Sequence, residues 1–479
     1  MEPVENLRTA RIKKVAALRK LGVDPYPAKV VKKNSVAQCL KSFGKNVVTA
    51  GRIMAIRTHG GSTFADLVDE SGKIQIFFSR DKLEAGSYQL IANLDIGDFL
   101  QVEGEVGKTK AGEVTIFATD FKILTKSIRP LPSKWHGLKD VEERLRRRYL
   151  DLIFNPSLKN IFILKTRFWE NVRDYLKAAG FFEVETPVLE AVPGGADAKP
   201  FITHHNTLDI DLYLRISLEL HLKRLIVAGF EKVFEIGRVF RNEGIDAEHL
   251  QDYTLLEFYW AYADYEMLAD FVEGFYREII KKTFGTLEFS FGSKKVDWGK
   301  KWARVDYFEI FKTETGLDLA KVGKEELLNY AKKIGGQVPK FYGKGRLIDL
   351  IYKKKIRPKL IQPSFLVNHP VEISPLAKKL EDDPKRVQRL QVLAAGSELG
   401  NGFSELNDPV DQKDRFEEQV KLREAGDEEA QMIDYDFVES LEYGMPPTAG
   451  FGVSERLFAI LVGKPMREVV FFPTLKPKK

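Results

Sequence analysis

The stretch Lys232-Val-Phe-Glu-Ile-Gly-Arg-Val-Phe-Arg-Asn-Glu243 alternates between core-type and polar side chains, as a β-strand does. A polar loop, Gly244 to Asp252, follows it, and Tyr253-Thr-Leu-Leu-Glu-Phe-Tyr-Trp260 then alternates again. The pattern predicts a long hairpin with charged residues at its end and inside its return strand.

Side chains that share one face of this hairpin suggest a binding site. With a period of two, Leu255, Glu257 and Tyr259 lie on one face, and an acid on such an apolar face must be paired or must await a cationic ligand. Arg241 and Glu243 share a face next to the loop, where an arginine binds a phosphate or carboxylate through two hydrogen bonds. For any one of these residues, a purely structural Arg–Glu pair is an equally good interpretation.

Two later stretches carry charged residues beside glycines. Ser397 to Leu406 places Glu398 and Glu405 seven residues apart around two glycines, which suits either a hard metal ion such as Mg²⁺ or a substrate ammonium group. Nearer the C-terminus, a glycine-rich strand or turn leads into the apolar run Leu457–Val462. Arg456 lies at that junction, where it either binds an anion or forms a salt bridge at a helix start.

The first quarter of the chain has a different pattern. Five short period-two segments within about 80 residues predict a small closed barrel of the OB-fold size. The five segments are Val47–Ile56, Phe64–Val68, Ile74–Phe78, Phe99–Val106 and Val114–Leu124. Such barrels stack and hydrogen-bond single-stranded bases, and Phe64 and Gln75 fit these two roles. Ordinary strand packing of Phe64 and simple exposure of Gln75 are the competing interpretations.

Composition favours an intracellular protein with a polyanionic partner. The segment 1–47 contains eleven Lys or Arg residues against three acids and includes an amphipathic helix from Leu7 to Leu21. A solvated helix face explains the same charges equally well. Cys39 is the only cysteine, which fits a reducing compartment, and no apolar run approaches the ~18 residues of a membrane span. We therefore expect a cytoplasmic protein without a membrane segment.

The fold class expected is α+β, with an antiparallel sheet in the larger, C-terminal part. No GxGxxG or GxxxxGK[ST] fingerprint occurs, and helices and strands mix without regular βαβ alternation. The predicted parts are a basic N-terminal helical extension (1–46), the barrel (47–125), a linker (126–149) and a catalytic domain (150–479). No function is assigned to the segment from about Lys312 to Lys355.

Three of these stretches, taken in order, resemble the signature motifs of class II aminoacyl-tRNA synthetases. Val184-Glu185-Thr186-Pro187 resembles motif 1, Phe240-Arg241-Asn242-Glu243 through Glu257 resembles motif 2, and Gly450-Phe451-Gly452 with Arg456 resembles motif 3. The chain resembles the lysyl-tRNA synthetases of the bacterial type more closely still, from about residue 47 to the C-terminus. The strings that carry this likeness are Leu131–Leu138, Arg148–Leu152, Pro193–Ala196, Pro200–Asn206, Ala261–Tyr265 and Leu399–Asp408.

The resemblance implies a role for each matching residue. Arg241, Glu243 and Arg456 are the expected catalytic residues. The ATP-binding set it implies is Arg241, Glu243, His249, Tyr253, Glu398 and Arg456. The lysine-binding set is Gly195, Glu219, Arg241, Glu257, Tyr259, Asn401, Phe403 and Glu405. Glu398 and Glu405 are the expected metal ligands, and Phe64 and Gln75 are expected to bind the anticodon.

The resemblance also implies the reaction and the partners. L-lysine would react with ATP in the presence of Mg²⁺ to give lysyl-adenylate and pyrophosphate, and the lysyl group would pass to the 3′ end of tRNA(Lys). Positioning and charge neutralisation suffice for this chemistry, without a covalent protein nucleophile. The proline of motif 1 implies a homodimer.

The chain departs from the family pattern at three places. Gln391 stands where the family has a second metal-binding glutamate, seven residues before Glu398, so the number of Mg²⁺ ions is left open. The run between the motif 3 glycines and Arg456 is one residue shorter. The motif 2 loop His249-Leu-Gln-Asp-Tyr253 lacks an Asn-Pro pair and has Tyr in place of Phe.

Three alternatives were compared with this assignment. A paralogue that transfers lysine to a protein would lack the N-terminal barrel. A sister synthetase for aspartate or asparagine shares the architecture, but Glu257 and Glu405 would repel an aspartate side chain. A catalytically weak tRNA-binding paralogue is supported only by Gln391.

Overall fold

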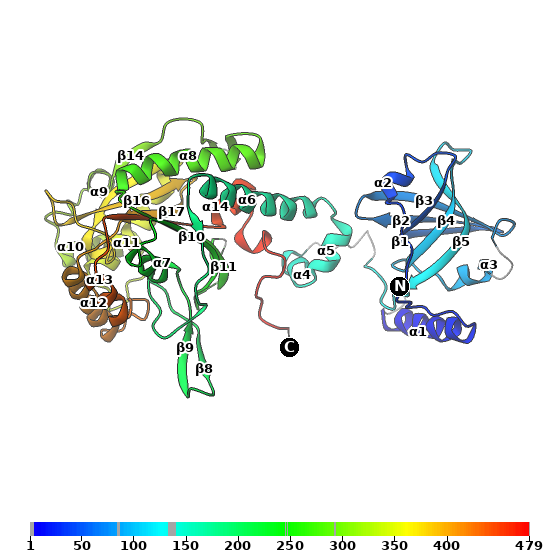
Figure 1. The fold of residues 1–479 in the computed structure, drawn as a ribbon, viewed down its shortest axis with the longest axis horizontal. Coiled ribbons are helices and arrows are strands. Elements are labelled where there is room, and N and C mark those ends of the chain that lie inside the picture. The colour runs from blue at the N-terminus through cyan, green and yellow to red at the C-terminus, as the bar shows by residue number, and fades with distance from the viewer. Residues whose placement is uncertain are drawn as a thin grey trace. The chain divides into compact units, whose positions relative to one another are not determined.

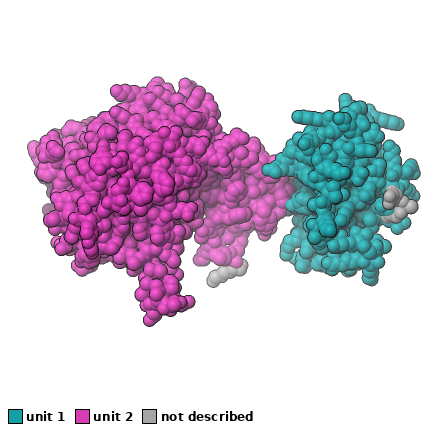
Figure 2. Space-filling view, viewed as in Figure 1, with its two compact units in different colours: residues 1–139 teal, residues 140–479 magenta. Residues whose placement is uncertain are grey.

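The structure is a computed structural model that describes residues 4–83, 87–132, 140–244, 246, 248–291 and 294–478. It contains two compact units, residues 1–139 and residues 140–479 (Figure 2). The string Leu131–Leu138, which contributed to the family resemblance, lies largely outside the described residues. No helix in the described part of the chain is both long and apolar enough to span a membrane.

The first unit is a closed five-stranded barrel with the strand order β1-β2-β3-β5-β4 (Figure 1). Its interior is filled by alternate apolar residues, such as Ile53, Leu67, Ile76 and Val102, each fully buried. The strands are β1 (Asn46–His59), β2 (Ser62–Asp69), β3 (Gly72–Ser79), β4 (Phe99–Lys108) and β5 (Val114–Thr125). The helices are α1 (Val4–Lys20), α2 (Val36–Cys39) and α3 (Ser87–Leu90). The predicted barrel and the predicted N-terminal helix are therefore confirmed.

Two basic side chains of the N-terminal helix α1 hold this helix against the rest of the barrel unit. Arg11 is buried and donates to the backbone oxygen of Ser127 (2.9 Å), and Lys14 pairs with Asp95 (2.8 Å). The same Asp95 contacts the buried ammonium group of Lys126. These cations stabilise the unit itself, so only the remaining exposed ones are free for a polyanion.

The second unit is built on an eight-stranded sheet with the order β14-β15-β16-β17-β18-β11-β10-β6. The run from β15 to β10 is antiparallel, and the two outermost pairs, β14–β15 and β10–β6, are parallel. These strands are β6 (Phe182–Glu183), β10 (Lys232–Phe240), β11 (Asp252–Ala261), β14 (Ala303–Asp306), β15 (Ser364–Pro370), β16 (Arg386–Ala394), β17 (Ser397–Ser404) and β18 (Thr448–Ser454). The predicted α+β class with an antiparallel sheet is confirmed.

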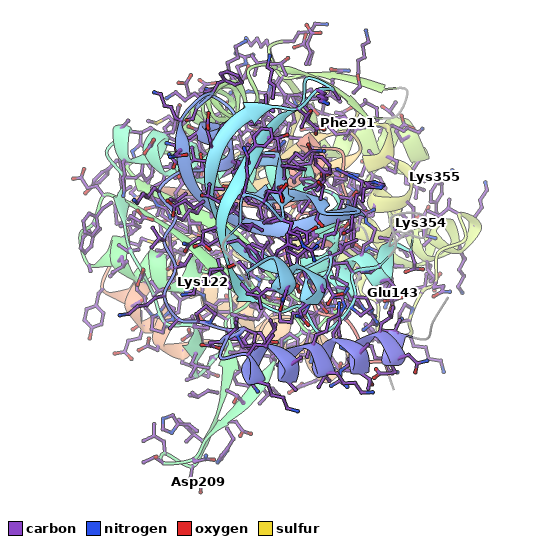
Figure 3. All side chains as sticks on the ribbon, turned by 90° about the vertical axis from the view of Figure 1, so that its right-hand side faces the viewer. Lys122, Glu143, Asp209, Phe291, Lys354 and Lys355 are labelled. Atoms are coloured by element: carbon purple, nitrogen blue, oxygen red, sulfur yellow. The ribbon has the colours of Figure 1, made fainter. Side chains whose placement is uncertain are left out.

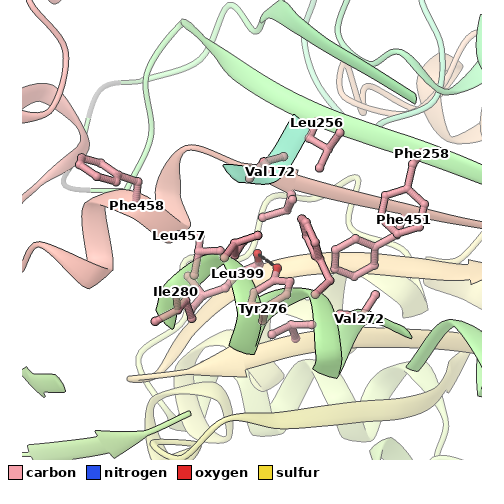
Figure 4. Packing of buried hydrophobic residues seen from close by; sticks show 14 of the residues in the cluster. Val172, Leu256, Phe258, Val272, Tyr276, Ile280, Leu399, Phe451, Leu457 and Phe458 are labelled. Carbon is pink, nitrogen blue, oxygen red and sulfur yellow. Dashed lines mark hydrogen bonds between the residues drawn. The ribbon is translucent and has the colours of Figure 1, made fainter. Parts of the chain in front are cut away.

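One face of this sheet packs on α8 and its neighbour α6, which lie side by side (Figure 1). Figure 4 shows Phe258 and Phe451 from adjacent strands against Val272 and Tyr276 of α8. The Tyr276 hydroxyl donates to the backbone oxygen of Leu399 (2.7 Å) and so ties α8 to β17. This buried aromatic face holds the central strands rigidly and leaves their other face for function.

Other helices border the opposite face or connect the strands. The helices of this unit are α4 (Val141–Arg146), α5 (Arg148–Phe154), α6 (Leu158–Ala178), α7 (Glu219–Val227), α8 (Tyr265–Phe284), α9 (Tyr307–Thr315), α10 (Lys324–Lys333), α11 (Lys344–Lys355), α12 (Pro409–Glu424), α13 (Tyr435–Glu442) and α14 (Arg456–Leu461). The small sheets comprise β7 (Leu189–Glu190), β8 (Ile202–His205), β9 (Ile210–Leu214), β12 (Glu288–Phe291) and β13 (Lys294–Asp297). Asp209 marks the tip of the projecting β8–β9 hairpin (Figure 3).

Candidate active site

A cleft of about 810 Å³ opens on the sheet face opposite α8. It brings together every site residue that the sequence predicted within the second unit. These are Gly195, Glu219, Arg241, Glu243, His249, Tyr253, Glu257, Tyr259, Glu398, Asn401, Phe403, Glu405 and Arg456. Residues that are more than 200 positions apart in the chain thus share one cavity.

Strict alternation along β11 delivers the first of these side chains. Leu255, Glu257 and Tyr259 line the cleft, whereas Leu256 and Phe258 lie in the core on the other face. The predicted shared face of β11 is therefore confirmed. Arg241 and Glu243 also line the cleft, although they lie just beyond the end of β10 at Phe240, so the first strand is shorter than its sequence pattern indicated.

A β-bulge in β17 brings Glu398 to the same face as Glu405. Alternation over seven residues would place these two acids on opposite faces of a regular strand. On β16, Val392 pairs with Gly400 and Leu393 pairs with Glu398, so Leu399 is the extra residue. Leu399 is buried in the core, and both acids line the cleft.

Glycine leaves room in β18 for the acid pocket. A Cβ atom on Gly450 would lie 2.3 Å from Glu405 Oε1 and 2.3 Å from the Tyr259 ring. Gly195, at the cleft edge with a φ of 83°, would likewise place a Cβ 2.8 Å from Ser217 Oγ. At both positions, glycine permits the backbone to approach a small ligand closely.

Glu257 is buried at the centre of the cleft and held by three donors. Ser217 Oγ (2.6 Å) and the Leu218 backbone N–H (3.2 Å) donate to its Oε1, and the Tyr259 hydroxyl donates to its Oε2 (3.1 Å). Burial, and then the charge of Glu219, raise the pKa of Glu257 to about 7. A positive ligand beside Glu257 would therefore ionise its carboxyl group.

Lys223 of α7 lies between the two other acids of the pocket. Its ammonium group is fully buried, donates to Glu219 Oε1 (2.5 Å) and forms an ion pair with Glu405. Burial alone would lower the pKa of Lys223, but the two carboxylates raise it, so this side chain stays charged. Burial raises the pKa of Glu219 and that of Glu405.

Two arginines mark the other end of the cleft. Arg241 Nε donates to the Ile216 backbone oxygen (3.3 Å), and its guanidinium lies 5.6 Å from the centre of the Tyr253 ring. Arg456 begins α14 and donates to the backbone oxygens of Glu248 and Glu398 (both 3.2 Å). Arg456 therefore reaches the cleft despite the shorter motif 3.

The Glu398 carboxylate is available to a cation. Within the described part of the chain it forms no ion pair and accepts no hydrogen bond. Gln391 on the neighbouring β16 is buried at the cleft, where its side chain lies next to the buried ring of His369. A carboxylate and an amide group that line the same cleft are ligand types that suit a hard cation such as Mg²⁺.

Sequence reasoning missed several cleft residues. Lys223 had a detectable signal, because Glu219 and Lys223 are spaced as an (i, i+4) pair on a helix. Arg389 Nε donates to Asn401 Oδ1 (2.8 Å) and fixes that side chain, but a lone arginine in a strand gave no such signal. Lys353 and Arg357 come from the α11 region, so residues near the end of the unassigned segment 312–355 line the cleft.

In the first unit, Phe64 belongs to an aromatic patch, here defined as Phe64, Phe77 and Phe117. The three half-buried rings lie on adjacent strands, with centroid distances of 4.8 Å and 5.6 Å. Gln75 is buried, donates to Glu113 Oε2 (3.0 Å) and accepts from Thr115 Oγ1 (2.9 Å). Its amide is thus already held by neighbours, and the aromatic patch is the more accessible feature.

Comparisons with known proteins agree with this architecture. Residues 140–476 match the family described as tRNA synthetases class II (D, K and N), and residues 47–124 match the OB-fold nucleic acid binding domain family. A lysine–tRNA ligase of Thermoanaerobacter sp. (strain X514) is 46% identical over 100% of this chain and 97% of its own length. Those of Syntrophomonas wolfei (45%; 99% of this chain, 98% of the relative) and Bacillus subtilis strain 168 (43%; 100% and 98%) are similar. The chain therefore belongs to the class II tRNA synthetases of the D, K and N group, with lysine–tRNA ligases as full-length relatives.

Proposed function

We propose that the protein activates L-lysine with ATP and transfers it to the 3′ end of tRNA(Lys). The observation that carries this proposal is the charge layout of the cleft, with arginines at one end and three buried acids at the other. Lysine and ATP have the complementary charges. The names of the full-length relatives support the same substrate.

The arginine end suits the nucleotide and the reacting carboxylate. Arg241 would bind the lysine carboxylate and the α-phosphate together, and Arg456 would neutralise the ATP phosphates. Tyr253 would stack on the adenine, with Glu243 and His249 making polar contacts to the nucleotide. His249 Nδ1 lies 2.8 Å from Asp246 Oδ2, which orients the His249 ring.

The acid end suits the amino acid. Gly195 and Glu219 would bind the α-amino group at the cleft edge. The side-chain pocket would consist of Glu257, Tyr259, Asn401, Phe403 and Glu405. A substrate without the ε-ammonium group would leave buried acids unpaired, which rejects it strongly.

The reaction proceeds in two transfers. A carboxylate oxygen of lysine attacks the α-phosphorus of ATP, a P–O bond forms, and pyrophosphate leaves. A ribose hydroxyl at the tRNA 3′ end then attacks the carbonyl carbon of the adenylate, and AMP leaves. In both transfers the chain orients the reactants and neutralises charge, without forming a covalent bond to substrate.

Glu398, with Gln391 beside it, would hold Mg²⁺, which when bound supplies positive charge to the phosphates of ATP. Glu405 was also predicted as a metal ligand, but its ion pair with Lys223 favours the lysine-pocket role. The carboxylate of Glu398 and the amide oxygen of Gln391 fit one ion better than two, because they contribute a single negative charge.

The remaining assignments are proposals of the same kind. The barrel would bind the anticodon through Phe64 and its aromatic patch, with Gln75 at its edge. The proline of motif 1, Pro187, would lie at a homodimer interface. The parts 1–46, 47–125, 126–149 and 150–479 would act as extension, anticodon-binding domain, linker and catalytic domain. A cytoplasmic location is consistent with the single, buried Cys39.

The test is pyrophosphate exchange into ATP, measured with each of the twenty amino acids. We expect exchange that depends on lysine and Mg²⁺ and that is abolished in Arg241→Ala. Arg238→Ala is the matched control, because Arg238 is exposed on β10, three residues before Arg241, and does not line the cleft. Equal exchange with aspartate, or none with any amino acid, would overturn the proposal. Formation of lysyl-tRNA, and not a lysylated protein, separates the enzyme from its protein-modifying alternative.

A further inference from the structure

Lys223 is the least expected member of the pocket, because a lysine-binding site already contains a lysine of its own. Its side chain is fully buried and its ammonium group contacts acids from two different elements, Glu219 of α7 and Glu405 after β17. The rings of Phe403 and Phe437 lie 5.4 Å and 5.7 Å from the same ammonium group. Two carboxyl groups and two aromatic rings therefore surround the ammonium group of Lys223.

The charge balance of the pocket follows from these contacts. Glu219, Glu257 and Glu405 bring three carboxyl groups, and Lys223 brings one ammonium group. Arg389 also faces Glu219, but its guanidinium donates to Asn401, to the Ile373 backbone oxygen and to Ser374. Two of the three carboxyl groups are therefore left without a counter-charge of their own. A lysine substrate carries two ammonium groups, and its carboxylate is met separately by Arg241. The pocket thus offers two uncompensated carboxyl groups to the two ammonium groups of the substrate. Without Lys223, one carboxylate would be in excess and would take up a proton, because buried charge is costly.

The position of Lys223 also decides which oxygen of Glu405 is free. Lys223 contacts Oε2 of Glu405. The other oxygen, Oε1, faces Gly450 and accepts no hydrogen bond in the described part of the chain. Oε1 is thus left as an acceptor for an arriving ammonium group, while Lys223 holds the other side of the carboxyl group.

We propose that Lys223 is a built-in counter-charge that positions Glu405 and matches the pocket to an amino acid with two ammonium groups. The inference rests on the proposed function, since it concerns the same pocket. The other titratable groups that face this cluster are Glu257 and Tyr259 from β11 and Arg389 from β16.

The experiment compares wild type with Lys223→Met, which retains an unbranched stem but has no charge. At pH 7 we expect the KM for lysine to rise about tenfold, the loss expected for one unpaired buried charge. This rise in the KM for lysine should be smaller toward pH 9, because the carboxyl group left unpaired in the variant then loses its proton before lysine binds. The KM for ATP should not change. Titration calorimetry in two buffers of different ionisation enthalpy should show about one more proton released on lysine binding than in wild type.

A purely structural role predicts a different result. Lost packing would raise the KM equally at all pH values and leave proton release unchanged, and that outcome would overturn the proposal. Lys282→Met removes an (i, i+4) partner of Glu278 on the exposed surface of α8 and should behave as wild type. If wild type itself does not bind lysine, the proposed function fails; if only the variant comparison fails, the counter-charge role fails.

Lys223→Gln and Lys223→Arg are made in parallel, the first neutral and the second charged. The role of charge would be supported if lysine binding released as many protons from Lys223→Arg as from wild type, and more protons from Lys223→Gln. Should both neutral variants fail to fold while Lys223→Arg binds lysine normally, the charge would serve folding and not substrate matching, and the inference would be wrong.

Discussion

Replacing Glu257 with glutamine is expected to stabilise the fold while it impairs lysine activation. Glu257 is 6% exposed, and in the folded protein burial and then Glu219 raise its pKa to about 7 from an ordinary 4.5. The folded state therefore binds a proton more tightly than the unfolded chain does. As the pH rises from 4.5 to 7, wild type loses stability because Glu257 ionises in the unfolded chain but keeps its proton in the folded protein, and above pH 7 the loss is constant.

The magnitude follows from the size of this shift. A difference of about 2.5 pKa units corresponds to about 3 kcal/mol at 1.36 kcal/mol per unit. Glutamine does not ionise, and its side-chain oxygen still accepts from Ser217 and the Leu218 backbone as Oε1 does now. The gain in free energy of unfolding should thus be near zero at pH 4.5 and approach about 3 kcal/mol at pH 8.

Urea denaturation at pH 5 and pH 8, followed by tryptophan fluorescence, measures the gain. Trp169, Trp260, Trp298 and Trp302 all belong to the unit that holds Glu257, so the signal reports on the relevant fold. Lysine-dependent pyrophosphate exchange measured on the same samples should fall. Such a gain at the expense of activity is typical of a functional group held in an unfavourable environment.

The control is Glu439→Gln on α13, an exposed position for which no pH-dependent gain is expected. The reasoning would be refuted if the stability of Glu257→Gln, relative to wild type, were the same at both pH values. It would also be refuted if the variant were less stable at pH 8, because the ionised carboxylate would then be stabilising.

Two further predictions concern other parts of the molecule. Phe77→Ala, which removes the central ring of the aromatic patch, should weaken tRNA binding about tenfold to a hundredfold, because base stacking contributes about 1–3 kcal/mol per base. A fluorescence anisotropy titration measures the affinity. If the affinity were unchanged while exchange activity stayed intact, the aromatic patch would be excluded as a tRNA-binding surface. Gln391→Glu should lower the Mg²⁺ concentration that gives half-maximal exchange, because it adds a second negative charge at the proposed cation site. If a metal titration showed that the variant needs more Mg²⁺ than wild type, the assignment of Gln391 and Glu398 to Mg²⁺ would be contradicted.

Much of this fold could be predicted from the sequence because apolar and polar side chains alternate along its strands. The barrel strands and β11 each have one face in a core, so their side-chain pattern has a period of two and their positions were predicted closely. The shared face of Glu257 and Tyr259 followed directly. The order of the eight strands did not, because adjacent strands such as β11 and β18 are almost 200 residues apart and local patterns carry no information on such pairing.

The parts of the site that sequence reasoning missed depend on tertiary contacts. Lys223 lies on a short helix with an ordinary (i, i+4) pair, and only the fold shows that Glu405 completes its environment. The sequence predicts that Gln75 binds bases, and this stays a prediction, but it gave no sign that the Gln75 amide is hydrogen-bonded to Glu113 and Thr115. In both cases the decisive partner comes from another element.

The extra residue in β17 has a consequence for how such a site diverges. Because Leu399 resets the alternation, the residues before it and those after it reach the cleft independently. Substitution after the bulge would remodel amino-acid choice, while substitution before it would alter nucleotide and metal handling, and neither change would require the other. A single strand thus carries side chains for both proposed binding roles, one on each side of the bulge.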